Sequence, residues 1–179
     1  MSAIILAACG SPFIWGDTVP ETITLRHVQP SDYAPIIQVL NDWWGGRLMS
    51  DMLPKLFFVH FRETSFIAEQ DGMCVGFLIG FLSQTSDDEA YIHFVGVHPD
   101  YRKAGVGRLL YERFFAAVRA EGRTVVRCVT APVNKTSIAF HLRMGFEAEP
   151  QPTTLDGVPF AQDYDGPGGD RVLLVKRLV

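Results

Sequence analysis

The sequence predicts one domain of the α/β (α+β) class, in which strands and helices pack around a single core. Apolar runs of strand length occur along the chain together with segments whose apolar residues recur at helical spacing. Two of the strand-like runs flank the pair Asp71-Gly72, which is typical of a tight β-hairpin. The chain has 179 residues, of which 47% are hydrophobic and 20% are charged, so it can bury a sizeable core.

The predicted elements follow the order βααβββαβαββ. Ser31 or Asp32 can cap the first helix, and two glycines after Trp44 can end it. Pro54 interrupts or restarts the second helical region, and Gly122 ends the third helix. A connection rich in Pro, Gly and Asp spans about 149–170. Six of the seven strands in this order have expected ranges, which are 21–28, 65–70, 73–84, 89–97, 124–131 and 171–178. The helices are expected at 32–43, 47–62, 106–121 and 134–144.

Composition excludes several classes of protein. The net charge of -4 and the pI near 5.7 argue against general nucleic-acid binding. An odd number of cysteines without a CxxC pair argues against a disulfide framework and against a zinc site, and the scattered histidines show no metal-ligand spacing. No apolar run of membrane-spanning length occurs. We therefore expect a cytoplasmic protein with no membrane or nucleic-acid partner and no metal.

The N-terminal residues 1–20 are expected to be an extension outside the domain, which spans 21–179. The stretch Leu6 to Gly10 is similar to a lipoprotein cleavage box. However, only eight residues precede Cys9 and none of them is basic, so the pattern of a signal peptide is incomplete.

A local cluster of cations and glycines stands at the start of the third predicted helix. It contains Arg102, Lys103, Gly105, Gly107 and Arg108. Glycine leaves backbone N–H groups uncovered, and a helix N-terminus carries partial positive charge, so this combination suits a phosphate. The alternative is a solvated basic turn.

Two common phosphate motifs do not fit this cluster. The P-loop pattern GxxxxGK[ST] is absent. The dinucleotide pattern GxGxxG fails at Leu110, and Arg127 stands where that fold usually carries an acid, which disfavours a nucleotide-binding oxidoreductase.

The remaining pattern, RxxGxG at 102–107, follows a strand that ends in Val-His-Pro. It resembles the [QR]xxGx[GA] motif of the GNAT (GCN5-related) N-acetyltransferase superfamily. Residues 134–146, NKTSIAFHLRMGF, resemble the N-x-x-[AS]-x-x-x-[YH]-x-x-x-G-F pattern of the same family. The resemblance covers about 22–178 in element order and 89–146 in motif detail. It implies the GNAT fold, a central mixed, mostly antiparallel sheet of about seven strands flanked by about four helices.

The resemblance also implies acetyl-CoA as cosubstrate. In the family, the loop at 102–108 binds the diphosphate, and the strand before it splays from its neighbour to expose backbone groups to the pantetheine arm. Gly96 is a candidate for close approach of that arm, and Asn134 can cap its helix while contacting the cofactor. The implied cofactor-binding residues are Val95, Val97, Arg102, Lys103, Ala104, Gly105, Val106, Gly107, Arg108, Asn134 and His141.

The candidate catalytic residues are His93 and His141. His93 occupies a position where family members place a Glu or His base, and it would share one face with Tyr91, Val95 and Val97 if the strand had no bulge. Glu89 is the reserve base. His141 stands where many relatives have a Tyr that protonates the departing thiolate. The alternative for each histidine is a structural or contact role.

The acceptor site is expected between the first two helices and the loop before the last strand. Trp43 and Trp44 could form an apolar or cation–π wall, and Asp163 with its neighbours could attract an ammonium group. The alternatives are core packing for the tryptophans and a solvated turn for the aspartates, among them Asp42, Asp156 and Asp165.

The predicted function is direct transfer of an acetyl group from acetyl-CoA to a primary amine of a small molecule or amino acid, in a ternary complex without a covalent enzyme intermediate. Two alternatives remain open: a non-catalytic acyl-CoA-binding regulatory module, and an acetyltransferase acting on a protein or peptide. A homodimer is also expected as a possible assembly.

Overall fold

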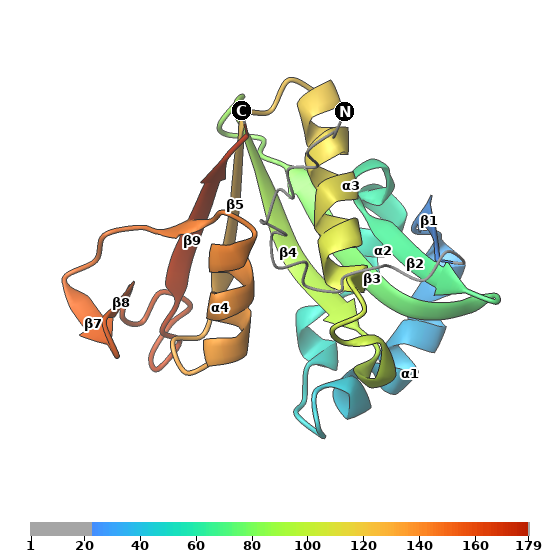
Figure 1. The fold of residues 1–179 in the computed structure, drawn as a ribbon, viewed down its shortest axis with the longest axis horizontal. Helices are drawn as coiled ribbons and strands as arrows, with labels where there is room; N and C mark the ends of the chain where they lie inside the picture. Colours follow the sequence, from blue (N-terminus) through green and yellow to red (C-terminus); the bar gives the residue numbers. More distant parts are fainter. Residues whose placement is uncertain (1–22, 179) are drawn as a thin grey trace, which may run out of the picture.

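The computed structural model describes residues 23–178, and the predicted extension at 1–20, with the stretch Leu6 to Gly10, lies outside them. A seven-stranded sheet runs through the molecule in the order β1-β2-β3-β4-β5-β9-β6, and a separate two-stranded sheet projects from it (Figure 1). Its strands are β1 (Thr24–His27), β2 (Phe66–Gln70), β3 (Met73–Leu82), β4 (Glu89–Val97), β5 (Val125–Thr130), β6 (Glu147–Ala148) and β9 (Val172–Arg177), and the small sheet pairs β7 (Thr153–Leu155) with β8 (Val158–Phe160).

Four α-helices cover the two faces of the large sheet. One core cluster joins the sheet to α3 and α4, and a second joins the opposite face to α1 and α2. The predicted fold class, a mixed sheet of about seven strands with about four helices, is confirmed. The helices are α1 (Tyr33–Trp43), α2 (Leu56–His60), α3 (Val106–Ala120) and α4 (Lys135–Arg143). None of the described helices is long and apolar enough to cross a membrane.

Two Asp-Gly turns join neighbouring strands. Asp71 and Gly72 connect β2 to β3 with φ values of 52° and 77°, as the sequence predicts. Asp156 and Gly157 connect β7 to β8 with φ values of 51° and 81°. The segment at 149–170 was expected to be only a connection, and this second hairpin corrects that expectation.

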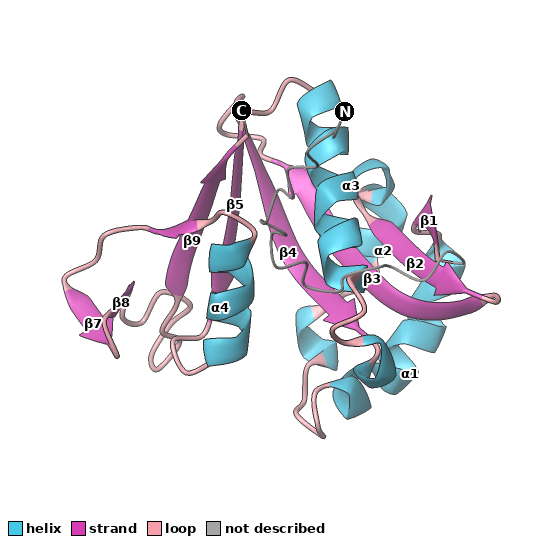
Figure 2. Cartoon of the chain, viewed as in Figure 1, coloured by secondary structure: helices cyan, strands magenta, loops and turns pink. Residues whose placement is uncertain are grey.

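Strand β4 separates the sheet into two halves. It pairs with β3 along its whole length, but it pairs with β5 only from Glu89 to Tyr91. Beyond Tyr91 the parallel strands β4 and β5 diverge, so the sheet opens between them (Figure 2).

A β-bulge in β4 changes which side chains share a face. Ile79 lies opposite Phe94 and Gly80 lies opposite Ile92, so His93 is the extra residue. Val95 and Val97 pack on the α3 side of the sheet, whereas His93 stacks on Phe57 of α2, on the other side. The condition under which His93 would share a face with Val95 and Val97, a strand without a bulge, is therefore not met.

Candidate active site

The opening between β4 and β5 exposes main-chain groups of β4. The N–H of His98 donates to the carbonyl oxygen of Val75 on β3, at 2.9 Å. Because hydrogen-bonded pairs alternate along an antiparallel ladder, Gly96 also bonds toward β3, while the main-chain groups of Val95 and Val97 face the opening. These groups can hydrogen-bond a ligand that lies between the strands.

The N-terminus of α3 lies next to the carboxyl end of β4. Gly105 is its N-cap, with φ at 79°, and it supplies no side chain to cap the helix. The preceding Lys103 also has a positive φ, 73°. The first N–H groups of a helix have no partner within the helix, so those of Val106, Gly107 and Arg108 are available to an anion. This arrangement fits the diphosphate of acetyl-CoA.

The side chain of Arg102 is used within the protein. Its Nη2 donates to the carbonyl oxygen of Trp43 at the end of α1, and its Nε donates to that of Val97 at 3.4 Å. The expectation that Arg102 offers its charge to phosphate is therefore not met in this arrangement. Arg102 instead ties the end of β4 to the end of α1.

The other residues of the loop differ in their surroundings. Arg108 pairs with Glu112 one turn along α3, at 2.7 Å. Lys103 is exposed, and Ala104 is half-buried. Lys103 is therefore the loop cation best placed to meet a phosphate in solution.

Asn134 and His141, both from the 134–146 motif, make hydrogen bonds within the protein. The Oδ1 of Asn134 accepts from the N–H of Ser137 at 3.1 Å, which is a helix cap. His141 is 7% exposed, and its Nδ1 lies 2.8 Å from the carbonyl oxygen of Ser137. Since a carbonyl only accepts, Nδ1 carries the proton, and Nε2 accepts from the hydroxyl of Tyr111 at 2.7 Å.

Both ring nitrogens of His141 are thus bonded inside the protein, and burial lowers its pKa. Tyr111 is itself fully buried, and burial raises its pKa well above the usual value. A neutral, internally bonded histidine does not present a proton to the opening. The structure therefore favours a structural role for His141 over the predicted acid.

His93, at the bulge of β4, differs from His141 because only one of its ring nitrogens is hydrogen-bonded within the described residues. Its Nε2 lies 2.8 Å from the carbonyl oxygen of Met52, and its ring stacks on Phe57 with centroids 4.3 Å apart. Nε2 therefore carries the proton, and Nδ1 keeps its lone pair with no hydrogen-bond partner among residues 23–178. Burial lowers the pKa of His93, so the ring is neutral near pH 7. These are the properties of a poised base.

The reserve base, Glu89, is occupied elsewhere. Its Oε1 lies 2.7 Å from the Nε of Arg127, and the same guanidinium reaches Glu149 at 2.7 Å. One arginine thus joins two carboxylates across β4, β5 and the end of β6. This ion-pair arrangement leaves Glu89 as a structural residue at the start of β4.

The two tryptophans divide between core and surface. Trp43 is 6% exposed and packs against Phe77 and His98, so the alternative of core packing holds for it. Trp44 is half-buried and lies on Phe94, with centroids 5.2 Å apart. Only Trp44 remains a candidate wall of the acceptor site.

Gly96 makes room for these aromatic side chains. A Cβ there would lie 2.5 Å from the ring of Phe77 and 3.0 Å from that of Trp44. The expectation that this glycine allows close approach of the pantetheine arm is therefore replaced by a packing explanation.

The aspartates of the acceptor loop have partners of their own. The Oδ1 of Asp163 accepts from the N–H of Gly168 at 2.6 Å, and Asp165 pairs with Arg171 at 2.7 Å. Asp156 pairs with Lys135 at 2.7 Å. Asp163 has a positive φ, 51°, and shapes the turn. The structure thus favours the structural alternative for these residues over binding of an ammonium group.

Comparison with known proteins decides between the families that such a site allows. The sequence profile of the Acetyltransferase (GNAT) family matches residues 33–146. This chain belongs to the GNAT acetyltransferase family. The match includes the bulge in β4, the loop before α3 and the whole of α4, and it confirms the resemblance carried by the two motifs.

Individual GNAT relatives extend this result. The chain is 32% identical over 141 residues to L-2,4-diaminobutyric acid acetyltransferase of Nocardia farcinica, covering 76% of this chain and 73% of that protein. It shares its fold with yncA from Salmonella typhimurium, solved with its cofactor acetyl-CoA (TM-score 0.63, 20% identity, 88% and 94% of the two chains covered). It also matches the ribosomal-protein-S18-alanine N-acetyltransferase from Escherichia coli (TM-score 0.65, 20% identity, 87% and 94% covered).

Three contributors to this GNAT site escaped the sequence analysis. Met52 acts through a main-chain oxygen, for which the sequence carries no signal. Phe57 and Tyr111 belong to apolar stripes on α2 and α3, and neither stripe distinguishes them from core residues. Within 23–178, no group of three or more His, Cys, Asp or Glu side chains could hold a metal ion.

Proposed function

We propose that this chain transfers an acetyl group from acetyl-CoA to a primary amine of a small molecule or amino acid, directly and within a ternary complex. The observation that carries the proposal is the position of His93. Its available Nδ1 lies on the α2 side of β4, at the point where β4 and β5 begin to diverge. The relation to a diaminobutyric acid acetyltransferase supports a small amine as acceptor.

Each part of the site has one task in this proposal. The first N–H groups of α3, with Lys103, would hold the diphosphate. The main-chain groups of Val95 and Val97 would hold the pantetheine arm between the strands. Acetyl-CoA supplies an acyl thioester, whose C–S bond breaks as the amine forms its C–N bond.

His93 would accept the proton that the attacking amine loses, at Nδ1, directly or through water. The hydrogen bond from Nε2 to Met52 fixes the tautomer and would stabilise the imidazolium that results. His141 has no proton task in this scheme, because its Nδ1 and Nε2 are both bonded internally.

The test is an acceptor screen that follows release of free CoA thiol and identifies the product by mass. L-2,4-Diaminobutyrate, simple amines and an alanine-ended peptide form the panel. Turnover with diaminobutyrate or another small amine, and little with the peptide, is the expected result. Turnover with the peptide alone would contradict a small-molecule acceptor and would favour a protein or peptide as the acceptor. Binding of acetyl-CoA without turnover on any amine would favour the non-catalytic module.

A further inference from the structure

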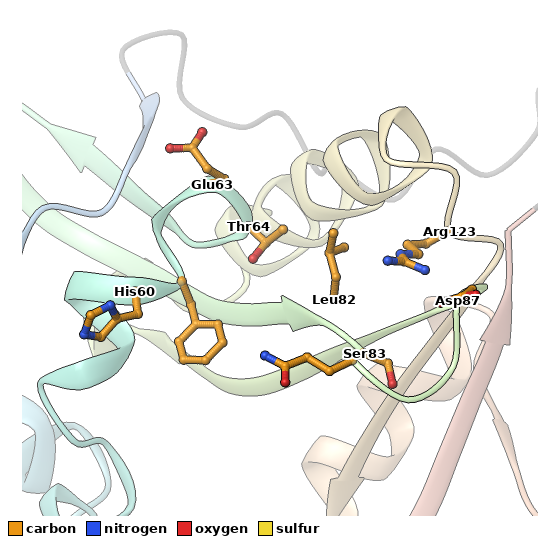
Figure 3. A pocket seen from close by; sticks show the side chains of 9 residues that line it. His60, Glu63, Thr64, Leu82, Ser83, Asp87 and Arg123 are labelled. Carbon is orange, nitrogen blue, oxygen red and sulfur yellow. The ribbon is translucent and has the colours of Figure 1, made fainter.

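A cavity of about 540 Å³ lies at the end of the sheet opposite the loop before α3 (Figure 3). Residues from three connections line it: those between α2 and β2, between β3 and β4, and between α3 and β5. Phe61 and Leu82 supply apolar surface, and Ser83, Gln84 and Arg123 supply polar groups. None of these residues belongs to the proposed acetyl-transfer site.

Aromatic rings stand between this cavity and the candidate base. Phe61 lines the cavity and contacts Phe57, with ring centroids 5.3 Å apart. Phe57 in turn stacks on His93, with ring centroids 4.3 Å apart. A ligand in the cavity would therefore contact Phe61 and would not reach His93 directly.

Arg123 carries a donor that the protein leaves unsatisfied. Its Nε is buried and has no hydrogen-bond partner among the residues that the structure describes. Other arginines of the described chain are paired: Arg127 with two glutamates and Arg171 with an aspartate. A buried N–H without a partner is unfavourable, so a turn of the Arg123 side chain that brings this N–H to an acceptor atom in the cavity would be favourable.

The surroundings of Arg123 select the kind of acceptor. In Figure 3 its guanidinium points toward Leu82 and into the hollow, and Glu63 points away from it. A carboxylate matches the fork of a guanidinium, and an apolar body of a few carbons would contact Leu82 and Phe61. Asp87 also lines the cavity, and the chain has a net charge of -4, so a doubly charged anion is disfavoured.

We propose that this cavity is a second ligand site, which binds a small monocarboxylate anchored on Arg123. It is separate from the acetyl-transfer site, and its existence does not depend on the proposed function. Binding is therefore tested on the full chain without acetyl-CoA or acceptor.

The experiment follows the Nε–Hε signals of the arginines by two-dimensional ¹H–¹⁵N NMR. Sodium propionate is the probe, and sodium chloride and propylammonium chloride at equal ionic strength are the controls. Arg123→Lys identifies the Arg123 signal by its loss, and Arg143→Lys, on the exposed side of α4, is the matched control. The wild-type titration carries the first test, in which these two lysine variants serve only for assignment.

We expect propionate to shift the Arg123 signal saturably over the millimolar range, while neither control salt does so. Arg123→Gln should weaken the binding of ¹³C-labelled propionate by about tenfold or more, because the charge-assisted hydrogen bonds are lost. A signal that moves no more with propionate than with chloride would overturn the proposal. So would equal propionate affinity in the wild type and in Arg123→Gln.

Discussion

The Nε2 of His93 and the carbonyl oxygen of Met52 lie 2.8 Å apart, although 41 residues separate them in the chain. This contact joins the bulge of β4 to the short turn before α2. It fixes the imidazole as the tautomer with its lone pair on Nδ1, and Phe57 holds the ring from one face. The bulge, the turn and the ring stack together give His93 a defined orientation before any substrate is present.

His93→Ala should lower kcat by about 10²–10⁴-fold, the usual scale for loss of a general base. The affinity for acetyl-CoA should change little, since His93 lies on the opposite side of the sheet from α3. Steady-state kinetics and calorimetry measure the two quantities. His60→Ala, which removes an exposed histidine of α2, is the control and should keep wild-type turnover. Near wild-type kcat in His93→Ala would remove the base from this residue.

Tyr111→Phe should destabilise the fold by about 1–3 kcal/mol, because the buried Nε2 of His141 would lose its donor. The kcat should stay close to that of the wild type if His141 is structural. Tyr33→Phe is the matched control, since that hydroxyl makes no hydrogen bond to other described residues. Urea unfolding measures the difference. A large loss of kcat with unchanged stability would return the acid role to the Tyr111–His141 pair.

Gly107→Glu should weaken acetyl-CoA binding by about tenfold or more, because an acid in the first turn of α3 repels phosphate. The fold should survive, since a Cβ at Gly107 would lie 3.4 Å from the ring of Phe140. Gly105 is a poorer choice because its φ of 79° strains any other residue. Gly107→Gln, of the same size without the charge, is the control, and calorimetry at two salt concentrations is the measurement. Equal affinity in Glu and Gln variants, with no dependence on salt, would contradict a phosphate site at this helix.

The two tryptophans should respond differently to removal. Trp43→Ala should lower the free energy of unfolding by about 3–5 kcal/mol, the usual cost of deleting a large buried aromatic side chain. Trp44→Ala should cost less and should raise the KM of the amine with little change in the KM of acetyl-CoA. Thermal unfolding and initial-rate kinetics check the pair. An unchanged amine KM in Trp44→Ala would assign Trp44 to packing as well.

The turns and helix ends of this fold can be predicted from the sequence. Asp71-Gly72 predicts its hairpin because both positions need positive φ, and Gly105 marks the start of α3 for a similar reason. The same signal at Asp156-Gly157 would have revealed the β7–β8 hairpin. These features depend on a few neighbouring residues, so the sequence shows them directly.

The parts of the site that depend on distant partners are not visible in the sequence. The bulge at His93 is defined by the register against β3, and the side chain of Arg102 is directed by a carbonyl oxygen at the end of α1. Likewise, Tyr111 decides whether His141 has a free nitrogen. Each of these outcomes is set by a contact between elements far apart in the chain.

The pH dependence of kcat/KM, compared between wild type and His93→Ala, tests the central claim most directly. The ratio of the two values cancels the ionisation of the amine, which both enzymes share. Burial lowers the pKa of His93, so its neutral form predominates above the ordinary histidine value of about 6.5. The account predicts a ratio that levels off towards neutral pH and falls at more acid pH, below the ordinary histidine pKa, as Nδ1 is protonated. A ratio that stays the same across the acid range would contradict the assignment of His93 as the base.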